Sequence, residues 1–585
     1  MKRVRYLALS GSGNLVHMRA VEVAALAGME VAINRPNFLL LADQPVGIFS
    51  QPGRTAFLLG WIYRRDGAKM SVDPLNPADA QDIFTIEGAI HLEKYWGSYV
   101  AILHDEDHDD ITVVRDPSGG MPCYYMKSQG VTAIGSDMAL FRQVGLLGSA
   151  IDDEQLGRHL YFPNLRTSRT CLAELNEIPA GFQLDIQLGK SELEQRWNPW
   201  DYARRQEYYG EPAAAISDLR ATLTSTIGAW VSRFPTLVVG LSGGLDSSIV
   251  AAAAVQAGAK VTGLTLVTDE TAGDERYYAR AIANFLHIPM EEVFFSADDT
   301  DLEMSHAAHL PRPLARSFAQ SGDQAYLAVA SAVSADAFFT GAGGDNVFCF
   351  QQSVLPIADR LLFEGVGRGA MVTAAEVAEM AETSIIRCAT LAARRAWLRK
   401  PQYRWKPKAD LLSRDFVSRL GAEFSHSWLE VPIGELPGKA AHIAYLIQIQ
   451  NHLEGFRRET VLPMINPLMS QPIVETCLRI PSWYFCMGGE NRSIARAAFD
   501  SRLPDSILHR RTKGGPDGFL QRLVERNRSK IKDMLLGGHL AAANIIDRSA
   551  VDAAIKLEGD RHNHMHFRIL ELVDAEAWVA AMKSS

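Results

Sequence analysis

The sequence predicts a two-domain α/β protein, with an antiparallel β domain over residues 1–205 and a domain built on a parallel sheet over residues 206–585. Length is the first reason, because a chain of 585 residues exceeds what one hydrophobic core organises. The second reason is a change of pattern along the chain. Short β-like runs fill the first part, whereas strands and helices alternate from about residue 213.

The predicted N-terminal strands alternate apolar and polar residues and are separated by glycine, aspartate and proline. They are FLLGWIYRRDG (57–67), GSYVAILHDEDHDDITVVRDPSGG (97–120), GMPCYYMKS (120–128) and GVTAIGSD (130–137). The acidic run at 105–110 predicts an exposed hairpin turn, since the spacing of an EF-hand calcium loop is absent. The domain boundary is predicted where the pattern changes, within QRWNPWDYARRQEYYGEP (195–212).

After this boundary the predicted elements alternate, which indicates a parallel sheet covered by helices. The predicted strands are LVVGL (237–241), KVTGLTLV (260–267) and DAFFTG (336–341). The predicted helices are SSIVAAAAVQAG (247–258), DERYYARAIANFLH (274–287) and QAYLAVASAVSA (324–335). The last 200 residues or so are predicted to be mostly helical.

The composition is that of an ordinary globular protein, with 47% hydrophobic and 22% charged residues. A net charge of −9 argues against nucleic acid as a partner. The six cysteines form no CxxC pair, so no disulfide framework or zinc site is predicted, and a reducing, cytoplasmic location is expected. No stretch predicts a signal peptide or a membrane span, so a membrane is not expected as a partner.

The stretch LVVGLSGGLDSSIVAAAAV (237–255) predicts an anion site between a buried strand and a helix. Two glycines let backbone N–H groups approach an oxyanion, and three hydroxyls add donors; these residues are Ser242, Gly243, Gly244, Ser247 and Ser248. Asp246 repels a phosphate unless a cation lies between them, which predicts Mg²⁺. The stretch matches neither GxxxxGK[ST] nor GxGxxG.

A second strand that runs into a glycine-rich turn, FFTGAGGDNVF (338–348), predicts the other half of the metal site. Asp345 is its candidate magnesium ligand, together with Asp246. A third segment, GGENRSIARAAFDSRLPDSILHRRTKGG (488–515), is rich in basic residues. Such a segment is either solvated surface or a partner for negative charge.

SGGLDSS resembles the pyrophosphate-binding loop of the N-type ATP pyrophosphatases, and the three segments together resemble the asparagine synthetase family. That family usually has SGEGSDE at the acidic loop and LRxA…LPxxIxxRxKxG near its C-terminus. The N-terminal part resembles the family's glutaminase domain, because VVRDPSGGMPCYY (113–125) stands where that domain has RDxxGxxPLYY.

The resemblance implies an N-terminal domain with the antiparallel β-sandwich of the Ntn hydrolases and a C-terminal synthetase domain of the PP-loop type. It implies ATP and Mg²⁺ as cofactors, with the nucleotide along the 242–248 loop and its adenine near Leu241 and Val267. Lys513 is the implied catalytic lysine, which faces the phosphates and the charge that develops during acyl transfer. The nucleotide contacts implied in the acidic loop are Thr340, Gly341 and Gly343.

Glutamine hydrolysis in this family needs a cysteine at position 2, where this sequence has Lys2. GWIYRRDG (60–67) stands where the family has NGEIYN, and it lacks the asparagine that helps to form an oxyanion hole. We therefore expect the N-terminal domain to be an inactive scaffold. The attacking amine is then expected to belong to the substrate itself.

Two branches of the family close rings in this way, the β-lactam synthetases and the lasso peptide cyclases. The β-lactam synthetases resemble GYGSD in the acidic loop, and the tyrosine of that motif belongs to a proton-relay pair. This sequence has Ala342 at that position. TGAGGDNVF and RWNPWDYA resemble the lasso cyclase form instead. The expected reaction is an isopeptide bond between the N-terminal amine and an Asp or Glu side chain of a precursor peptide. A leader-binding protein and a leader protease are the implied partners.

Alternative interpretations stay open. One is an asparagine synthetase-like or β-lactam synthetase-like ligase that acts on a small amino acid, and another is a nucleotide-binding pseudoenzyme.

HNHMH (562–566) is predicted to be a helix entry rather than a zinc site, because no cysteine or carboxylate lies at ligand spacing. The basic stretch RRAWLRKPQYRWKPK (394–408) is predicted to be solvated surface, with a docking face for the peptide as the alternative.

Overall fold

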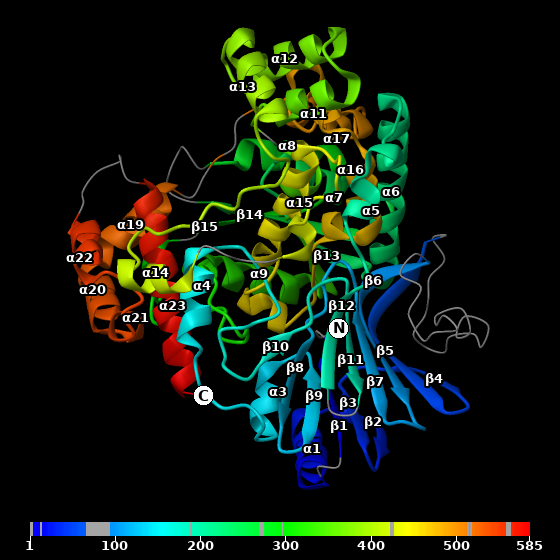
Figure 1. The fold of residues 1–585 in the computed structure, drawn as a ribbon, viewed down its shortest axis with the longest axis vertical. Helices are drawn as coiled ribbons and strands as arrows, with labels where there is room; N and C mark the ends of the chain where they lie inside the picture. The colour runs from blue at the N-terminus through cyan, green and yellow to red at the C-terminus, as the bar shows by residue number, and fades with distance from the viewer. Residues whose placement is uncertain are drawn as a thin grey trace.

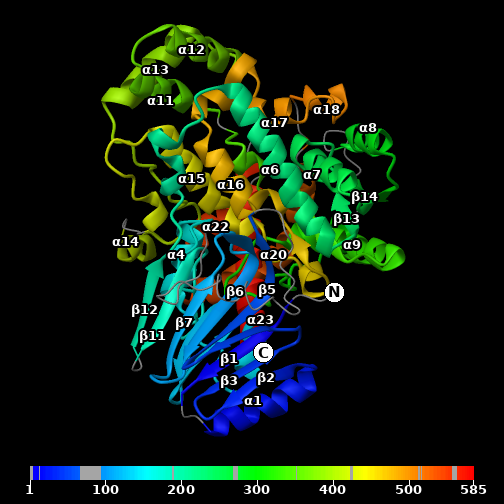
Figure 2. The same ribbon diagram turned by 90° about the vertical axis from the view of Figure 1, so that its right-hand side faces the viewer.

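A computed structural model describes residues 4–11, 14–65, 94–187, 190–267, 274–294, 296–350, 352–421, 426–511, 514, 517–556 and 563–584. Two antiparallel sheets form the N-terminal part, and a parallel sheet surrounded by helices forms the centre of the remainder (Figures 1 and 2). The predicted fold class is therefore confirmed. The exact boundary at residues 205 and 206 stays a prediction.

The two N-terminal sheets each have six strands, in the orders β10-β8-β9-β1-β3-β2 and β12-β11-β7-β6-β5-β4. The strands of the first sheet are β1 Tyr6–Ser10, β2 Glu30–Arg35, β3 Phe38–Ala42, β8 Tyr124–Ser128, β9 Val131–Gly135 and β10 Asn176–Glu177. Those of the second are β4 Gly47–Gln51, β5 Arg54–Arg64, β6 Tyr95–Asp105, β7 Asp110–Arg115, β11 Phe182–Gln187 and β12 Lys190–Gln195. As predicted, the acidic run forms the exposed turn between β6 and β7.

Strand β3 shows why this part forms a two-layered sandwich. Its residues are all buried, and alternate side chains point to opposite faces of the sheet. Phe38 and Leu40 lie in the core between the two sheets, whereas Leu39 and Leu41 lie in a second core with residues of the C-terminal helices. A continuous apolar run therefore fits a strand that is covered on both faces.

The parallel sheet has the order β15-β14-β13-β16-β17, and it is formed by β13 Thr236–Gly240, β14 Lys260–Val267, β15 Met290–Phe294, β16 Ala337–Phe339 and β17 Met464–Ile465. Central β13 pairs in parallel with both β14 and β16. The crossovers that this requires are helical, as the alternating pattern predicted. β17 comes from much later in the chain than its neighbour β16.

The helices of the N-terminal part and of the parallel sheet's surroundings are α1 Asn14–Ala27, α3 Met138–Gln143, α4 Asp153–Tyr161, α5 Trp200–Ala203, α6 Pro212–Arg233, α7 Leu245–Gln256, α8 Arg276–Leu286, α9 Gln320–Val333, α10 Gly344–Val347, α15 Pro437–Ile449, α16 Gln471–Arg479, α17 Ser493–Ala498 and α18 Asp505–Leu508. A lobe at the top of Figure 1 contains α11 Leu355–Glu364, α12 Arg368–Met380 and α13 Ile385–Trp397. The remaining helices are α14 Arg414–Leu420, α19 Asp517–Arg526, α20 Arg528–Gly537, α21 His539–Ala542, α22 Arg548–Lys556 and α23 Asn563–Ser584.

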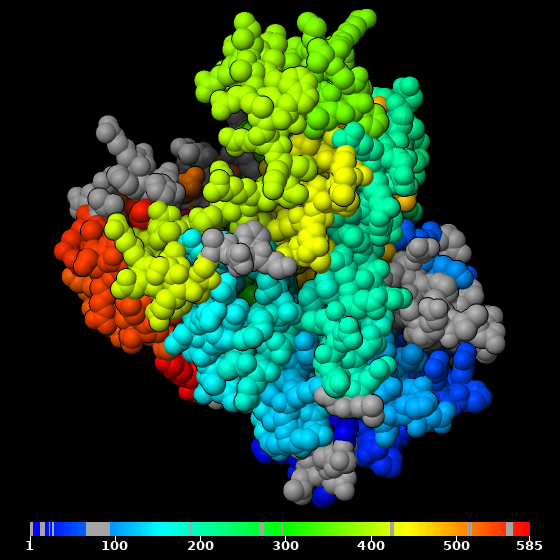
Figure 3. All heavy atoms as spheres, in the orientation of Figure 1, coloured from blue at the N-terminus to red at the C-terminus, as the bar shows by residue number. Residues whose placement is uncertain are grey.

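The C-terminal helices pack back onto the N-terminal part. In Figure 3 the segment with α14 lies between the orange and red C-terminal helices and the cyan segment that includes α4. Gly157 of α4 lets Phe416 of α14 approach its backbone, because a Cβ there collides with the Phe416 ring. Among the described residues, every helix falls short of the length and apolarity that crossing a bilayer requires. The six cysteines are all buried and free.

Candidate active site

Two glycine-rich loops meet at one edge of the parallel sheet. Val239 of β13 pairs with Phe339 of β16, and each strand runs directly into its loop. The carboxyl ends of adjacent parallel strands therefore bring the two loops side by side, at the kind of edge where α/β proteins bind ligands.

The loops touch so closely that only glycine fits at the contact. A Cβ on Gly341 would come within 2.5 Å of the Ser247 backbone nitrogen. A Cβ on Gly344 collides with the Asp246 carboxyl group. Gly243 has a φ of 61°, which costs a glycine little but strains other residues. The glycines that the sequence placed around an anion therefore also allow the two loops to pack.

The two aspartates singled out from the sequence converge on one point. Arg492 bonds both of them through its Nη1 atom, with distances of 3.1 Å to each Asp246 oxygen and 2.5 Å to Asp345 Oδ1. Arg492 adopts a left-handed conformation with a φ of 54° just before α17. The carboxylates are thus arranged to share one positive charge.

This donor set fits Mg²⁺. The metal is held in proteins by one or two carboxylates together with phosphate oxygens and water. Asp246 and Asp345 supply two carboxylates that face one cationic atom. No group of three or more metal-ligating side chains gathers within the ranges that the structure describes, so a metal here needs further oxygen ligands from a phosphate-bearing substrate.

The opposite wall of the site is positively charged. A pocket of about 400 Å³ is lined by the start of helix α7 and by four arginines, Arg492, Arg496, Arg510 and Arg511. The first turn of α7 has free N–H groups and the positive end of the helix dipole. Arg510 is fixed by hydrogen bonds to Ser242 O at 3.0 Å and to Glu275 at 2.7 Å. The pocket is therefore built to hold an anion with several charges.

Seven of the residues predicted from the sequence line this pocket, namely Ser242, Gly244, Asp246, Ser247, Gly341, Gly343 and Asp345. Gly243 and Ser248 belong to the same loop but lie behind its surface. Leu241, just after β13, and Val267, at the end of β14, are buried to about 1% exposure and are not part of the pocket wall, so their contact with adenine stays a prediction. Thr340 turns the other way and donates to Asn466 at 2.6 Å.

Lys513 lies outside the described residues, and its catalytic role stays a prediction. The sequence analysis did not single out the four arginines of the pocket, although all lie within the basic 488–515 segment. The high content of basic residues in that segment was the feature that pointed to them. The histidine-rich run at 562–566 enters helix α23 at Asn563, while His562 is not described.

The acidic loop is supported from behind by helix α15. His442 is fully buried and donates from Nε2 to Val347 O at 2.9 Å. Burial, together with nearby Lys439, lowers the pKa of His442 to about 3, so the ring is neutral at pH 7. Asn346 donates to Tyr445 O at 2.7 Å. These bonds fix the short helix α10 that carries Asp345.

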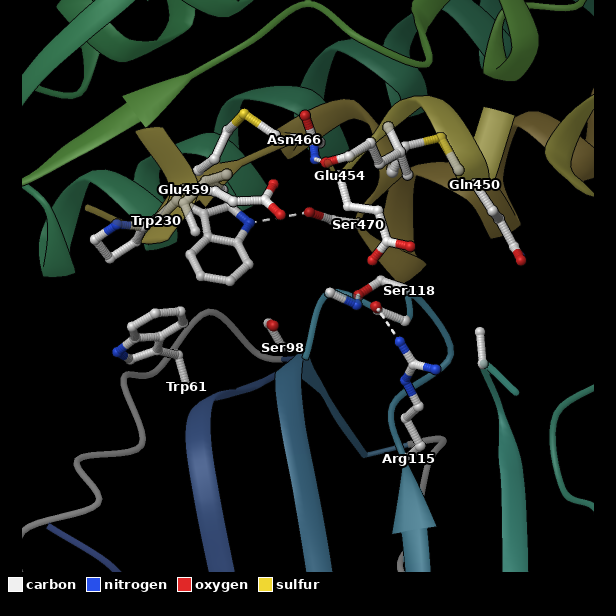
Figure 4. Close-up of a pocket in the computed structure, with 18 of the residues that line it drawn as sticks. Trp61, Ser98, Arg115, Ser118, Trp230, Gln450, Glu454, Glu459, Asn466 and Ser470 are labelled. Atoms are coloured by element: carbon white, nitrogen blue, oxygen red, sulfur yellow. Dashed lines mark hydrogen bonds between the residues drawn. The ribbon is translucent and has the colours of Figure 1, made fainter. Parts of the chain in front are cut away.

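A second cavity, of about 100 Å³, lies between the N-terminal sheets and the parallel-sheet domain. Figure 4 shows Trp61 and Ser98 of the N-terminal part facing Trp230 and Ser470 across it. Trp230 donates to Ser470 at 2.9 Å and meets Trp61 edge to face. None of the residues that line this cavity in the described part of the chain is a cysteine.

The fold joins a β-sandwich to an α/β domain in which two glycine-rich loops and two carboxylates line one pocket. The description "Asparagine synthase" matches residues 218–446 and 456–580, more than half of the chain, and "Glutamine amidotransferase domain" matches residues 82–198. The chain belongs to the asparagine synthase family.

One curated relative is the carboxyethyl-arginine beta-lactam-synthase of Streptomyces clavuligerus, 27% identical over 262 residues that cover 43% of this chain and 47% of that protein. The chain thus spans about half the length of that relative. Solved structures with slight likeness include an allosteric regulatory enzyme of purine biosynthesis, 12% identical over 51% of this chain and 82% of that one, with a TM-score of 0.23. Another is NMN synthetase from Francisella tularensis, 18% identical over 24% and 60%, with a TM-score of 0.18.

Proposed function

We propose that the protein is an ATP-dependent ligase that forms carbon–nitrogen bonds and, more specifically, a lasso peptide cyclase. It adenylates an Asp or Glu side-chain carboxylate of a precursor peptide and joins that carboxyl to the peptide's N-terminal amine, with release of AMP and pyrophosphate. A leader-binding protein and a leader protease are the partners that this proposal requires. The observation that carries it is an intact nucleotide pocket whose acidic loop has a small residue, Ala342, on the pocket wall.

The chain's own residues account for ATP binding in this proposal. The start of α7 and the hydroxyls of Ser242 and Ser247 donate hydrogen bonds to phosphate oxygens. The arginines of the pocket wall neutralise the remaining charge. Asp246 and Asp345 would hold Mg²⁺, which would supply positive charge against the phosphates.

The reaction has two bond exchanges. A carboxylate oxygen of the peptide bonds to the α-phosphorus as the bond to the β-phosphate bridge breaks and pyrophosphate leaves. The amine nitrogen then bonds to the activated acyl carbon, loses a proton, and AMP leaves. Arg492 and Arg496 lie where they stabilise the negative charge on the phosphates, and Lys513 is proposed to stabilise the charge of the acyl transfer. The site's main contribution is to hold both peptide groups close together.

Two features support an amine that arrives with the substrate. The cavity between the domains presents Trp61, Ser98 and Trp230 and no cysteine among its described lining residues, so it offers no thiolate for glutamine hydrolysis. Cys123 is fully buried in the sandwich, and burial raises the pKa of its thiol to about 12. Ala342 leaves more room at the nucleotide pocket than the tyrosine of the β-lactam synthetase form.

Mass spectrometry of the reaction with a candidate precursor peptide, ATP and Mg²⁺ tests the proposal. We predict a product that has lost one water, formed together with AMP, and resistant to aminopeptidase because its N-terminus is blocked. An equal yield of AMP with aspartate and ammonia, and no peptide product, would instead identify an asparagine synthetase-like ligase. No AMP with any of these substrates would identify a nucleotide-binding pseudoenzyme.

A β-lactam synthetase-like activity is the second candidate, because the curated relative has that name. Carboxyethyl-arginine serves as the comparison substrate in the same assay. Loss of one water from that small molecule, with AMP release and no peptide cyclisation, would make this the function of the chain.

Arg492 gives a further prediction about nucleotide binding. We expect Arg492→Ala to raise the KM for ATP roughly 10- to 100-fold, because a charge-assisted hydrogen bond contributes roughly 1.5–3 kcal/mol. Arg492→Lys keeps the charge and is expected to fall between the two. Arg502→Ala is the control, since Arg502 bonds only exposed Gln256 among the described contacts. Steady-state kinetics with ATP varied measures all three, and equal KM values for Arg492→Ala and wild type contradict the role.

A further inference from the structure

Three consecutive residues at the end of helix α15 face three different hollows. Ile449 lines the nucleotide pocket, Gln450 lines the cavity between the domains, and Asn451 lines a groove at the surface seam between them. Residues 450–452 form one 3₁₀ turn. The residue that lines the seam groove thus follows the one that lines the nucleotide pocket by two positions, a backbone rise of about 4 Å in a 3₁₀ turn.

Asn451 is the unexplained residue of this groove. Its side chain is 2% exposed, and neither its Nδ2 nor its Oδ1 has a hydrogen-bond partner among the described residues. A buried amide without partners costs free energy, roughly 1–3 kcal/mol for a group left unsatisfied. Its backbone is held firmly, since Asn451 O accepts a hydrogen bond from Arg316 at 2.8 Å. The side chain is therefore placed with one donor and one acceptor to offer.

The groove has two connected parts that share Asn451 and His159 in their walls. The larger part has about 350 Å³ and lies between helix α4, the segment 162–171 and Arg312. The smaller has about 110 Å³ and reaches the C-terminal helix α23 at Arg568. Together they have the size of a site for a few residues of an extended chain.

The groups around Asn451 are neutral or already paired. Burial, then Arg312, lowers the pKa of His159 to about 4, and burial lowers the pKa of His452 to about 4, so both rings are neutral at pH 7. Arg166 and Arg312 line the groove but form ion pairs with Glu177 and Glu454. The groove therefore presents the neutral hydrogen-bond donor and acceptor of Asn451 at its base, rather than an unpaired charge.

We propose that this seam groove holds the substrate peptide, and that Asn451 hydrogen-bonds a peptide group of its backbone. A carboxamide presents one N–H and one C=O side by side, which matches the C=O and N–H of an extended chain. The inference rests on the proposed function for the identity of the peptide. It also gives the N-terminal domain a task, since α4 and the segment 162–171 form one wall of the groove.

The first test uses two substitutions of Asn451 and the candidate precursor peptide of the cyclisation assay. Asn451→Leu removes both polar atoms at similar size, and Asn451→Asp removes the donor alone. We expect Asn451→Leu to raise the KM for the peptide about tenfold or more, with the KM for ATP unchanged. Gln450→Leu is the matched control, because its neighbouring side chain lines the other cavity, and it is expected to keep both KM values.

The second test needs no turnover and no variant. The same peptide, carrying a photoreactive benzophenone, is irradiated with wild-type protein, and the crosslinked residues are mapped by mass spectrometry. Crosslinks to residues 154–171 or to 451–452, lost on addition of unlabelled peptide, support the groove even if no cyclised product forms. Crosslinks only elsewhere overturn it, even if wild type cyclises the peptide.

Two results identify other occupants. If Asn451→Leu keeps the wild-type KM for the peptide and the same thermal midpoint, Asn451 holds an ordered water only, and the proposal is wrong. If free glutamine, and not unlabelled peptide, removes the crosslinks, the groove binds a free amino acid amide, and the peptide assignment is wrong.

Discussion

Asp246→Asn is expected to lower the rate of ATP–pyrophosphate exchange on the order of 1,000-fold and to leave the protein folded. The exchange is measured with labelled pyrophosphate and the candidate precursor peptide. Asparagine has the shape of aspartate but lacks its charge, so it keeps the packing against Gly344 and removes half of the carboxylate pair that meets Arg492. The proposed magnesium site would then have only the Asp345 carboxylate, and it would lose affinity for the cation that would neutralise the phosphates.

The control for this variant is an aspartate at the other end of the same sheet. Asp336 precedes β16 and accepts a hydrogen bond from Thr236 N at 2.9 Å, away from the glycine loops. We expect Asp336→Asn to keep the wild-type exchange rate, and both variants to keep the far-ultraviolet circular dichroism of wild type. Exchange at the wild-type rate in Asp246→Asn contradicts the assignment of the carboxylates to the metal.

The strand–loop–helix units could be predicted from sequence because each is a local pattern. LVVGL and DAFFTG are short apolar runs, and each leads directly into glycines and an aspartate. Their meeting also follows from a general rule, since parallel strands end at one edge of a sheet. Asp246 and Asp345 could therefore be paired across about 100 residues without coordinates.

Arg492 could not be assigned in the same way. Basic residues are common on surfaces, and its contact with both aspartates depends on a left-handed turn before α17. Leu241 directly follows β13 and Val267 ends β14, and both side chains are buried outside the pocket wall, so their contact with adenine stays a prediction.

The ion-pair network between the two parts could not be predicted from the sequence either, because its charged residues come from four distant segments. Glu177 of β10 is fully buried and bonds Arg115 and Arg166 at 2.5 Å each, and it also bonds Arg312 of the parallel-sheet part. Arg166 and Arg312 further pair with Glu454 at 3.0 and 3.1 Å. Three arginines therefore depend on two glutamates in a largely buried place.

We predict that Glu177→Gln destabilises the protein by about 3–5 kcal/mol, the usual cost of breaking a buried ion pair by removing one partner. The variant leaves Arg166 and Arg312 with Glu454 as their carboxylate partner and removes the carboxylate that pairs with Arg115. Glu292→Gln is the control, because Glu292 bonds Arg280 at an exposed site and such pairs contribute about 0–1 kcal/mol. Differential scanning fluorimetry compares the thermal midpoints, and equal midpoints for the two variants contradict the role of the network.

The pH dependence of this difference follows from the pKa of Glu177. Burial alone raises that pKa, but the three arginines overcome it and hold the pKa well below the usual range. A carboxylate with a depressed pKa stabilises the fold fully above its unfolded pKa, and the contribution is lost as pH falls through the folded value. The difference between wild type and Glu177→Gln is therefore complete above about pH 5 and shrinks progressively below pH 4. A difference that grows on acidification instead shows that Glu177 is protonated in the folded protein, and the seam is then held by neutral hydrogen bonds rather than by charge.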